Sequence, residues 1–408
     1  MRIGTLEQVR AEFAALPGRP RAVVSGNAAT PWTLLRLFDE AVDSYVLHLL
    51  NPHPGVPDRP GVGLETAFVG PGARRSPQLS YVPTRLSMLP LLYSDALAPD
   101  VVLLRTSVPR DGAVSMGIEV NVLPAAVEAV RDRGGVVVCQ LDPSMPYTFG
   151  DGELPTDQVD WAVEASDVLG SPRVSAPDAA AEHIAEQVAG QIADGATIQI
   201  GIGEVPDAVV GGLMRRRELR VWSEMISDGV LALERAGRLD RDVPISASFL
   251  FGSPELYQWA DQNPRLRLLR TETTNAPALI ARNPAMVSIN TALQVDLFAQ
   301  VNASRIKGRI HSGFGGQTDF IVGALHAPGG QALIALKSWH AKADVSTIVP
   351  MVDEPVTSFQ PSSVVTEQGV ARLRGNNEKD QAMHLIENAA HPSMREELRE
   401  EAYALGLA

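Results

Sequence analysis

Cysteine is nearly absent from the 408-residue sequence, and so are long hydrophobic runs. The one cysteine, Cys139, lies in the apolar run 136–139, which is typical of a buried core residue rather than a catalytic thiol. A single thiol excludes a disulfide framework within the chain and indicates a reducing, cytoplasmic location. No apolar stretch approaches the roughly 20 residues that cross a bilayer. The first 18 residues are amphipathic and carry two acidic side chains, so we expect neither a membrane segment nor a signal peptide.

Positive charge is also in short supply. The chain has 35 Lys and Arg residues against 48 Asp and Glu residues, which gives a formal net charge of −13. This balance argues against nucleic acid and anionic membranes as general partners, although a local site can still hold an anionic small molecule. The composition is otherwise that of an ordinary globular protein, and the length favours two domains with sizeable cores.

Several catalytic signatures are missing as well. The eight histidines show no HxxxH or Cys/His spacing, so no metal site is predicted; only His311 adjoins a glycine-rich loop. No GxSxG elbow occurs, which leaves a serine thioesterase unsupported. No GxxxxGKS or GxxxxGKT loop occurs, which disfavours an ATP-dependent CoA ligase.

What the sequence does contain is a clear β-turn-α-β unit within residues 196–229. Apolar and polar residues alternate over 196–200, and the glycine turn Gly201-Ile202-Gly203 follows. Pro206 suits the first position of the next helix, where no backbone N–H is missed. A second β-type run, 219–222, leads to Glu224.

This unit places a carboxylate beside a cluster of backbone N–H groups. Parallel strands joined by a helix present their carboxyl ends at one edge of the sheet, so the turn 201–203 and Glu224 should lie at the same rim. Glycine N–H groups next to a helix N-terminus form an anion site. A carboxylate beside such a cradle makes sense if the cradle holds a developing oxyanion while the carboxylate attacks or takes a proton.

Two other interpretations of this unit stay open. The first is a dinucleotide site, because an acidic residue about 20 positions after the glycines belongs to that fingerprint. Pro206 stands where the third glycine of that fingerprint would be. The second is a structural turn followed by a surface glutamate, since glycine turns after strands are common.

A second glycine-rich loop, residues 308–320, strengthens the acyl-transfer interpretation. Gly313, Gly315 and Gly316 free several N–H groups there. A β-type run, 285–290, puts Asn290 at a sheet rim too. Oxyanion donors are then expected at Gly315, Gly316 and the turn 201–203, and one such donor is typically worth about 3 kcal/mol of barrier. A plain turn is the alternative for this loop.

The alternation of β and α signals along both halves predicts an α/β protein with open, mainly parallel sheets. Residues 151–180 are polar and loop-like, so we place a domain boundary between 177 and 178, giving domains 1–177 and 178–408. A helix is expected over 178–192. Near the C-terminus, Ser393 and Glu396 predict a capping box for the last helix.

Short motifs follow one another in an order that is more specific than any one of them. They are Gly201-Ile202-Gly203, Val205-Pro206-Asp207-Ala208-Val209, Ser223-Glu224-Met225, Ser227-Asp228-Gly229, Asn290-Thr291-Ala292-Leu293, Ser312 through Phe320, Val365-Thr366-Glu367 and Leu373-Arg374-Gly375. In these motifs the chain resembles the acetyl-CoA hydrolase/CoA-transferase family, near its 4-hydroxybutyrate and butyrate/acetate CoA-transferase branch. The resemblance covers most of the chain and is strongest from about 195 to 405.

The resemblance implies two open, mainly parallel-sheet domains of CoA-transferase type, with the active site in the interdomain cleft, and a homo-oligomer, expected to be a dimer. It also implies small-molecule partners, an acyl-CoA and a carboxylic acid. Glu224 would attack the acyl-CoA to give an acyl-glutamyl anhydride, and the released CoA would convert this into a glutamyl-CoA thioester, with ping-pong kinetics. Catalytic roles are expected for Glu224, Gly315 and Gly316.

Residues expected to contact CoA lie on both glycine loops and at two strand ends. They are Gly201, Ile202, Gly203, Asn290, Gly313, Gly315, Gly316 and Lys337. Because CoA carries phosphates and the chain is acidic, Lys337, Arg309 and Lys307 are the candidate cations, with a solvated surface role as the alternative for each.

The chain departs from the family pattern at Trp222-Ser223, at Gln294 and over 336–340, where Lys337 stands. The bulk of Trp222 beside Glu224 leaves the acyl group open among acetyl, butyryl and 4-hydroxybutyryl. Three alternatives to a CoA-transferase stay open: an acyl-CoA hydrolase in which water intercepts the same intermediate, a dinucleotide-binding oxidoreductase, and a catalytically silent CoA-binding protein.

Overall fold

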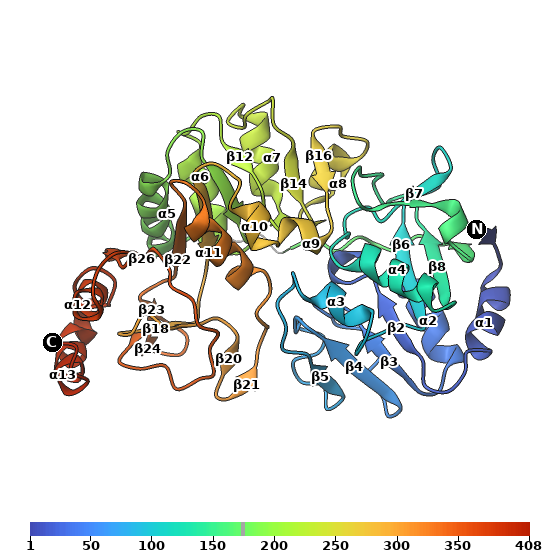
Figure 1. Ribbon diagram of the computed structural model, residues 1–408, viewed down its shortest axis with the longest axis horizontal. Helices are drawn as coiled ribbons and strands as arrows, with labels where there is room; N and C mark the ends of the chain where they lie inside the picture. The colour runs from blue at the N-terminus through green and yellow to red at the C-terminus, as the bar shows by residue number, and fades with distance from the viewer. Residues whose placement is uncertain (173–175) are drawn as a thin grey trace. The chain divides into compact units, whose positions relative to one another are not determined.

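The computed structural model describes residues 1–172 and 176–408, and the chain divides into two compact units (Figure 1). The first unit is Met1–Pro172 with Pro244–Thr274, and the second is Arg173–Val243 with Asn275–Ala408. The sequence led us to expect a single boundary at 177/178, but the first unit also takes residues 244–274. The β-α alternation continues through residues 244–274, so the sequence pattern does not indicate that this segment belongs to the first unit.

The first unit is built on an eight-stranded sheet in which each described pair of neighbours is parallel. Its central strands are short valine- and leucine-rich runs buried along their length, as expected of a parallel sheet covered on both faces. In spatial order the strands are β1 (Arg2–Ile3), β10 (Trp161–Glu164), β8 (Val136–Leu141), β6 (Val101–Thr106), β2 (Arg21–Val24), β3 (Tyr45–His48), β4 (Val62–Thr66) and β5 (Leu79–Tyr81).

The expectation of a loop over 151–180 is wrong at two short strands and holds for residues 165–172, while residues 173–175 lie outside the described part of the chain. Strand β9 (Glu153–Pro155) pairs with β7 (Ala113–Ser115), and β10 is inserted between β1 and β8 of the large sheet. The four residues of β10 are too short a run to stand out from polar neighbours, and only pairing on both sides makes them a strand.

Helices and buried polar pairs complete the first unit. Helices α1 (Leu6–Ala14) and α2 (Trp32–Ala41) pack against each other, and α4 (Leu123–Asp132) packs on β2, β6 and β8. The short helix α3 (Leu89–Tyr93) contacts α4. Arg105 and Asp142, both fully buried, form an ion pair of 2.7 Å at the ends of neighbouring strands.

The returning segment 244–274 joins this unit through backbone hydrogen bonds. The amide of Leu268 donates to Phe149 O at 2.9 Å, and the amide of Thr271 donates to Asn121 O at 3.0 Å. The segment itself contains β14 (Ile245–Ala247), β15 (Phe249–Leu250), α8 (Pro254–Ala260), β16 (Leu266–Leu268) and α9 (Thr271–Thr274). Strands β14 and β16 pair in parallel.

The second unit has a six-stranded sheet that is parallel except for its last pair. In order the strands are β12 (Arg220–Val221), β11 (Thr197–Ile200), β17 (Met286–Asn290), β22 (Gln331–Ala335), β26 (Ser363–Thr366) and β27 (Gly369–Arg372). The carboxyl ends of the first five strands therefore meet at one edge, as the sequence predicted. Together the two sheets confirm the α/β fold class.

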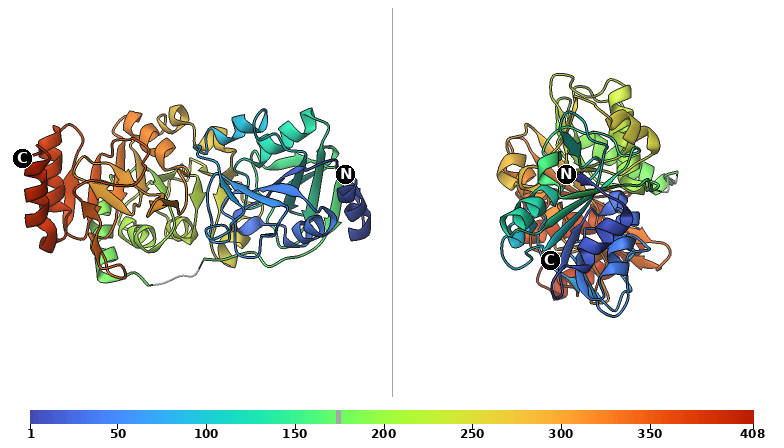
Figure 2. Two further views of the ribbon diagram at one scale, coloured as in Figure 1. Left: turned by 90° about the horizontal axis from the view of Figure 1, so that it is seen from below. Right: turned by 90° about the vertical axis from the view of Figure 1, so that its right-hand side faces the viewer.

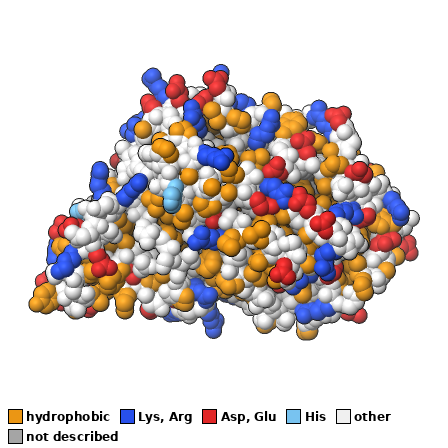
Figure 3. All heavy atoms as spheres, viewed as in Figure 1, with side chains coloured by type: hydrophobic (Ala, Val, Ile, Leu, Met, Phe, Trp, Pro, Cys, Tyr) orange, Lys and Arg blue, Asp and Glu red, His pale blue; other side chains and the backbone are white. Residues whose placement is uncertain are grey.

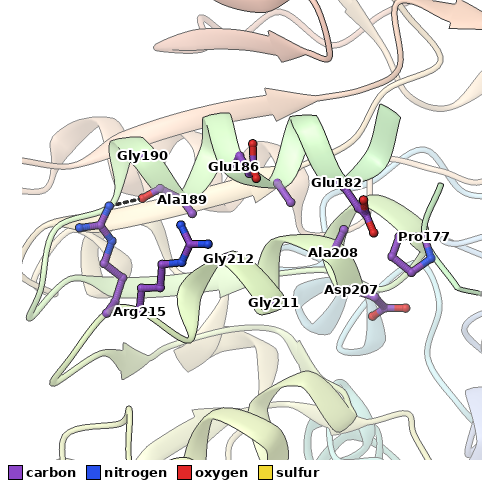
Figure 4. A pocket seen from close by; sticks show the side chains of 12 residues that line it. Pro177, Glu182, Glu186, Ala189, Gly190, Asp207, Ala208, Gly211, Gly212 and Arg215 are labelled. Carbon is purple, nitrogen blue, oxygen red and sulfur yellow. Dashed lines mark hydrogen bonds between the residues drawn. The ribbon is translucent and has the colours of Figure 1, made fainter. Parts of the chain in front are cut away.

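Helices pack on both units' sheets, and in the second unit the tightest pairing is between α5 (Ala179–Gln191) and α6 (Glu204–Leu213). A Cβ on Gly212 would lie 2.8 Å from the Cβ of Ala189, so glycine allows this close approach. A groove of about 610 Å³ lies beside these helices, and Figure 4 shows the side chains that line it. One of its lining residues, Arg216, donates from its guanidinium to the carbonyl of Ala189 at 2.6 Å. Gly211 also lines this groove, and a Cβ there would meet no atom within 4 Å.

The remaining helices of the second unit pack beside α6, beside the central strands or at the C-terminal end. Helix α7 (Asp228–Arg235) contacts α6, α10 (Pro277–Ile280) contacts α11 (Gln317–His326), and α11 packs on β17 and β22. Helices α12 (Glu378–Asn388) and α13 (Arg395–Ala404) lie side by side at the C-terminal end (Figure 2).

The predicted capping box of the last helix is wrong. Ser393 lies in the short 3-10 turn Pro392–Met394, and α13 begins after Met394 without a side-chain cap. His391 takes the capping role for the turn, because its ring nitrogen accepts from the amide of Ser393. Leu398 and Ala402 of α13 are buried in the core of the second unit.

Charged side chains of both signs are interspersed over the face drawn in Figure 3, as the composition suggests. Within the described residues, every helix is too short or too polar to span a lipid bilayer.

Candidate active site

The first glycine turn connects β11 to α6 as predicted, but the helix begins two residues earlier than expected. Its first residue is Glu204, so Pro206 occupies the third helical position instead of the first. Proline is tolerated there because the first N–H groups of a helix have no partner within the helix. Gly203 precedes the helix with φ +122°, a conformation that favours glycine.

The main chain of this turn is open to approach. A Cβ on Gly201 would meet no atom within 4 Å, and the nearest atom to a Cβ on Gly203 would be Cδ of Pro206 at 4.0 Å. Ile202 between them is 43% exposed, which is high for an isoleucine. The turn therefore presents backbone and one apolar side chain at the carboxyl edge of the sheet.

Glu224 follows β12 in the bend before β13 (Met225–Ile226), at the same sheet edge as the turn. Its side chain is partly buried, and Nδ2 of Asn275 donates to its Oε2 at 2.8 Å. Burial raises the pKa of Glu224 to about 7; the Asn275 hydrogen bond opposes this shift, and the negative charge of Asp319 adds to it. The fold thus holds a poorly solvated carboxylate that titrates near neutral pH.

The second glycine loop packs directly against this carboxylate. A Cβ on Gly316 would lie 1.8 Å from Oε2 of Glu224 and 2.6 Å from Nδ2 of Asn275. The φ of Gly316 is −90°, which any residue can adopt, so the contact and not the backbone conformation requires glycine here. Gly315 does adopt a positive φ, +55°, and Gly313 is at +157°.

The N-terminus of α11 continues this arrangement. Gly316 precedes the helix, and Asp319, fully buried, stands in its first turn. Its carboxylate is the group whose charge acts on Glu224. The structure therefore brings Glu224, Gly315 and Gly316 together, three residues that the sequence assigned to catalysis.

The sequence did not single out Asn275 or Asp319. Asn275 lies 51 residues after Glu224 in sequence, follows a short helix and carries no periodic signal. Its complete burial together with the hydrogen bond to Glu224 becomes visible only in three dimensions. Asp319 lies within the glycine-loop motif, but its proximity to Glu224 could not be read from spacing.

Asn290 ends β17 at the predicted rim, and its side chain has protein partners. Its Nδ2 donates to Oγ of Ser288 at 2.7 Å and to Oε1 of Gln199 at 3.2 Å. Gln199 belongs to β11, so this polar cluster ties the two central strands together. A contact between Asn290 and a ligand stays a prediction.

The structure gives Lys337 partners that the sequence analysis did not foresee. Its Nζ lies 2.7 Å from Oδ2 of Asp178 and 2.8 Å from Oε2 of Glu204. Burial opposes the charge of Lys337, but the two carboxylates outweigh it and raise its pKa. A lysine shared by two carboxylates offers no surplus positive charge, so the expected role on CoA phosphates loses its main support.

The other candidate cations lie on a hairpin formed by β20 (Arg305–Ile306) and β21 (Arg309–Ile310). Lys307 and Arg309 are exposed there, and the amide of Gly308 between them is held by Glu354 at 2.9 Å. Binding of phosphate by this hairpin stays a prediction. His311 follows it, with its amide donating to Ser304 O at 2.7 Å.

Two motifs that stood out in the sequence have structural partners. Trp222 packs against a cluster that includes Met286 and Phe320, so at least part of its bulk belongs to the core. Glu367 accepts hydrogen bonds from the amide and hydroxyl of Ser338, which together hold its pKa below the usual range despite burial.

No group of three or more His, Cys, Asp or Glu side chains within residues 1–172 and 176–408 is arranged to hold a metal ion.

Comparison with known proteins shows which family the chain resembles along its length. The family model of the acetyl-CoA hydrolase/transferase C-terminal domain matches residues 252–402. The chain is 34% identical to 4-hydroxybutyrate coenzyme A transferase of Clostridium kluyveri, over 96% of this chain and 93% of that protein.

Solved structures show the same fold across the chain. RipA from Yersinia pestis superposes with a TM-score of 0.92 at 26% identity, covering 100% of this chain and 98% of RipA. A 4-hydroxybutyrate CoA-transferase from Porphyromonas gingivalis superposes with a TM-score of 0.80 at 27% identity, covering 99% of this chain and 98% of that one. The fold is thus of the CoA-transferase type. The chain belongs to the acetyl-CoA hydrolase/CoA-transferase family of enzymes, and the resemblance of its motifs to that family is confirmed.

Proposed function

We propose that this protein is a CoA-transferase that moves CoA between a short-chain acyl-CoA and a carboxylic acid, through a glutamyl-CoA thioester on Glu224. One observation carries the proposal: the Glu224 carboxylate, poorly solvated and bonded to Asn275, lies directly against Gly316 of the glycine loop. A desolvated carboxylate is a better nucleophile than one in water, and glycine amides beside it suit an oxyanion.

The chemistry runs in two half-reactions. An oxygen of Glu224 attacks the thioester carbonyl, the C–S bond breaks, and an acyl-glutamyl anhydride and the CoA thiolate result. The thiolate then attacks the glutamyl carbonyl carbon, which releases the acyl group as a free carboxylate and leaves a glutamyl-CoA thioester. The acceptor carboxylate reverses these steps: it forms a second anhydride, and the thiolate attacks its acyl carbon to give the new acyl-CoA and regenerate Glu224.

Each tetrahedral intermediate places negative charge on an oxygen that needs donors. We assign this role to the amides of Gly315 and Gly316, in the loop that packs against Glu224, and to the turn 201–203 at the same sheet edge. These groups are fixed by the fold, so they stabilise the charge without reorganising during the reaction. Gly201, Ile202, Gly203, Asn290 and Gly313 are proposed to line the CoA site with them.

Acyl-CoA hydrolysis is the second candidate, and the family name covers both activities. It would use the same glutamyl intermediate with water as the final acceptor. Added acetate separates the two: it accelerates CoA exchange by a transferase and leaves thiol release by a hydrolase unchanged. Family membership removes the support for a dinucleotide-binding oxidoreductase.

The homodimer and the cytoplasmic location stay predictions. Light scattering of the purified protein tests whether it is a dimer.

Intact-protein mass spectrometry tests the proposal. The protein is mixed with acetyl-, butyryl- and 4-hydroxybutyryl-CoA, and wild type is compared with Glu224→Gln, which has nearly the same shape and cannot form the anhydride. A CoA adduct on wild type only supports the glutamyl-CoA intermediate, and the donor that gives most adduct identifies the acyl class. CoA binding without adduct or thiol release on any donor would instead show a catalytically silent CoA-binding protein.

A further inference from the structure

We propose that Lys337 is a positioning residue that fixes the first glycine turn through an ionic clamp with Asp178 and Glu204, rather than a ligand of CoA phosphates. The inference rests on the proposed function, because the turn matters only if its amides serve acyl transfer.

The clamp is a closed set of contacts. Nζ of Lys337 lies 2.7 Å from Oδ2 of Asp178 and 2.8 Å from Oε2 of Glu204. The other oxygen of Glu204 accepts from the amide of Asp178 at 3.1 Å, and the other oxygen of Asp178 accepts from the amide of Ala181 at 3.0 Å. All four carboxylate oxygens are therefore bonded within the set.

The three residues join elements that are distant in sequence and meet at the turn. Glu204 is the first residue of α6 and directly follows Gly203. Asp178 caps the N-terminus of α5. Lys337 follows β22, and its carbonyl accepts from the Thr347 hydroxyl at 2.6 Å, which fixes the point from which its side chain extends.

The turn is weakly restrained by packing. Cβ atoms placed on Gly201 or Gly203 would be in no contact closer than 4.0 Å, and Ile202 is 43% exposed. Side-chain packing therefore does little to fix the three amides. The bonds to Glu204, one residue beyond Gly203, act directly next to the turn and constrain the direction of its amides.

Charge argues against the phosphate role. One ammonium group between two carboxylates leaves a net charge of about −1, and that charge would repel a phosphate. The clamp groups are partly exposed, with side-chain exposure of 28% for Lys337, 35% for Glu204 and 57% for Asp178. Solvent screens such a pair, so its value lies in geometry more than in stability.

The test uses two thioesters with the same acyl group: the full acyl-CoA and the acyl-pantetheine, which lacks the nucleotide and its phosphates. Lys337→Met should lower kcat by about tenfold on both substrates, because small misplacement of donors is costly. Lys337→Arg, which keeps the charge, should recover most of the loss. Lys342→Met removes an exposed lysine of the same segment with no ion pair in the described chain, and should match wild type.

A phosphate role predicts the opposite split. Lys337→Met would then raise KM for acyl-CoA, leave kcat unchanged and have no effect on acyl-pantetheine, and that result would overturn the clamp. Equal kinetics for Lys337→Met and wild type on both thioesters would overturn it too. The clamp also predicts that Glu204→Gln lowers kcat, and that the double variant is no slower than Lys337→Met alone, since both act through one contact.

Failure of this inference differs from failure of the proposed function. If wild-type protein transfers CoA and forms the Glu224 adduct while the Lys337 variants behave as a phosphate site predicts, only the clamp is wrong. If wild-type protein forms no adduct and shows no turnover with any thioester, the proposed function fails, and the clamp fails with it.

Discussion

Nδ2 of Asn275 donates a 2.8 Å hydrogen bond to Oε2 of Glu224, and both side chains meet over the α-carbon of Gly316. The bond fixes one oxygen of the carboxylate and leaves the other available for attack. It also stabilises the charged form of a group whose burial favours the neutral form. The Asn275 bond therefore bears on both the reactivity and the ionisation of Glu224.

The pH dependence of the first half-reaction should follow Glu224. Attack needs the carboxylate, so the rate should rise with pH around a midpoint near 7, the pKa of this group. Asn275→Ala removes a bond that lowers this pKa, so the midpoint should move up by roughly 0.5–1 pH unit. Asp319→Asn removes a charge that raises it, so the midpoint should move down. Stopped-flow thiol release over pH 5–9 measures both, and shifts in one common direction would contradict this assignment.

Gly316→Ala should abolish most of the activity while the protein still folds. The added methyl group would overlap Oε2 of Glu224, so the carboxylate or the loop must move. We expect a loss of at least about a hundredfold in kcat, given the cost of displacing a nucleophile from its donors. Gly190→Ala is the matched control, because a Cβ there meets no atom within 4 Å. Activity of Gly316→Ala close to that of Gly190→Ala would refute the contact.

Glu224→Gln should stabilise the protein, and more so at higher pH. The folded-state pKa of about 7 lies above the ordinary value of 4.5, so the fold favours the protonated acid. Its stabilising contribution is complete below pH 4.5 and is lost as pH rises through 7. The variant removes this penalty, on the order of 3 kcal/mol at pH 8 and close to nothing at pH 4.5. Thermal melts of both proteins at the two pH values provide the measurement, and a gain that is equal at both would count against the raised pKa.

Adjacent glycines of α6 should respond in opposite ways to alanine (Figure 4). At Gly212 a Cβ would crowd Ala189 Cβ at 2.8 Å and Ala185 O at 3.1 Å, so alanine should destabilise the protein by about 1–3 kcal/mol. At Gly211 a Cβ meets nothing within 4 Å, so alanine should stabilise it by about 0.5–1 kcal/mol, as expected for an exposed helical glycine. Urea unfolding of the two variants measures these changes in the free energy of unfolding. A similar change for both variants would show that α5 and α6 are not in close contact.

Local patterns in the sequence predicted the unit of β11, the glycine turn, α6 and Glu224. The β-type run 196–200, Gly203 and the apolar face of the helix each carry their signal within a few residues. The rim position of Asn290 followed from the same logic and is confirmed by the end of β17. These are features that propensity and periodicity determine.

Long-range pairing explains what the sequence did not reveal. Asn275 and Lys337 find their partners across 51 to 159 positions of chain, and no spacing rule covers such distances. Strand β10 is stabilised by pairing with β1 and β8 on either side, and its four residues are too short a run to stand out from their polar neighbours in the sequence. Ser393 had the residue types of a capping box, but Pro392 begins a 3-10 turn there instead.

The exchange of residues 244–274 into the first unit bears on how the chain is made. The ribosome synthesises the chain from its N-terminus, and domains tend to fold in that order during synthesis. The first unit cannot be completed when residue 172 appears, because Leu268 and Thr271, which bond to Phe149 and Asn121, are synthesised only after a large part of the second unit. Until those residues are synthesised, the carbonyl groups of Phe149 and Asn121 in the nascent first unit lack these backbone hydrogen bonds. A gene fragment that stops at codon 177 encodes a first unit that lacks residues 244–274. A fragment that stops at codon 274 encodes all the strands of the first unit.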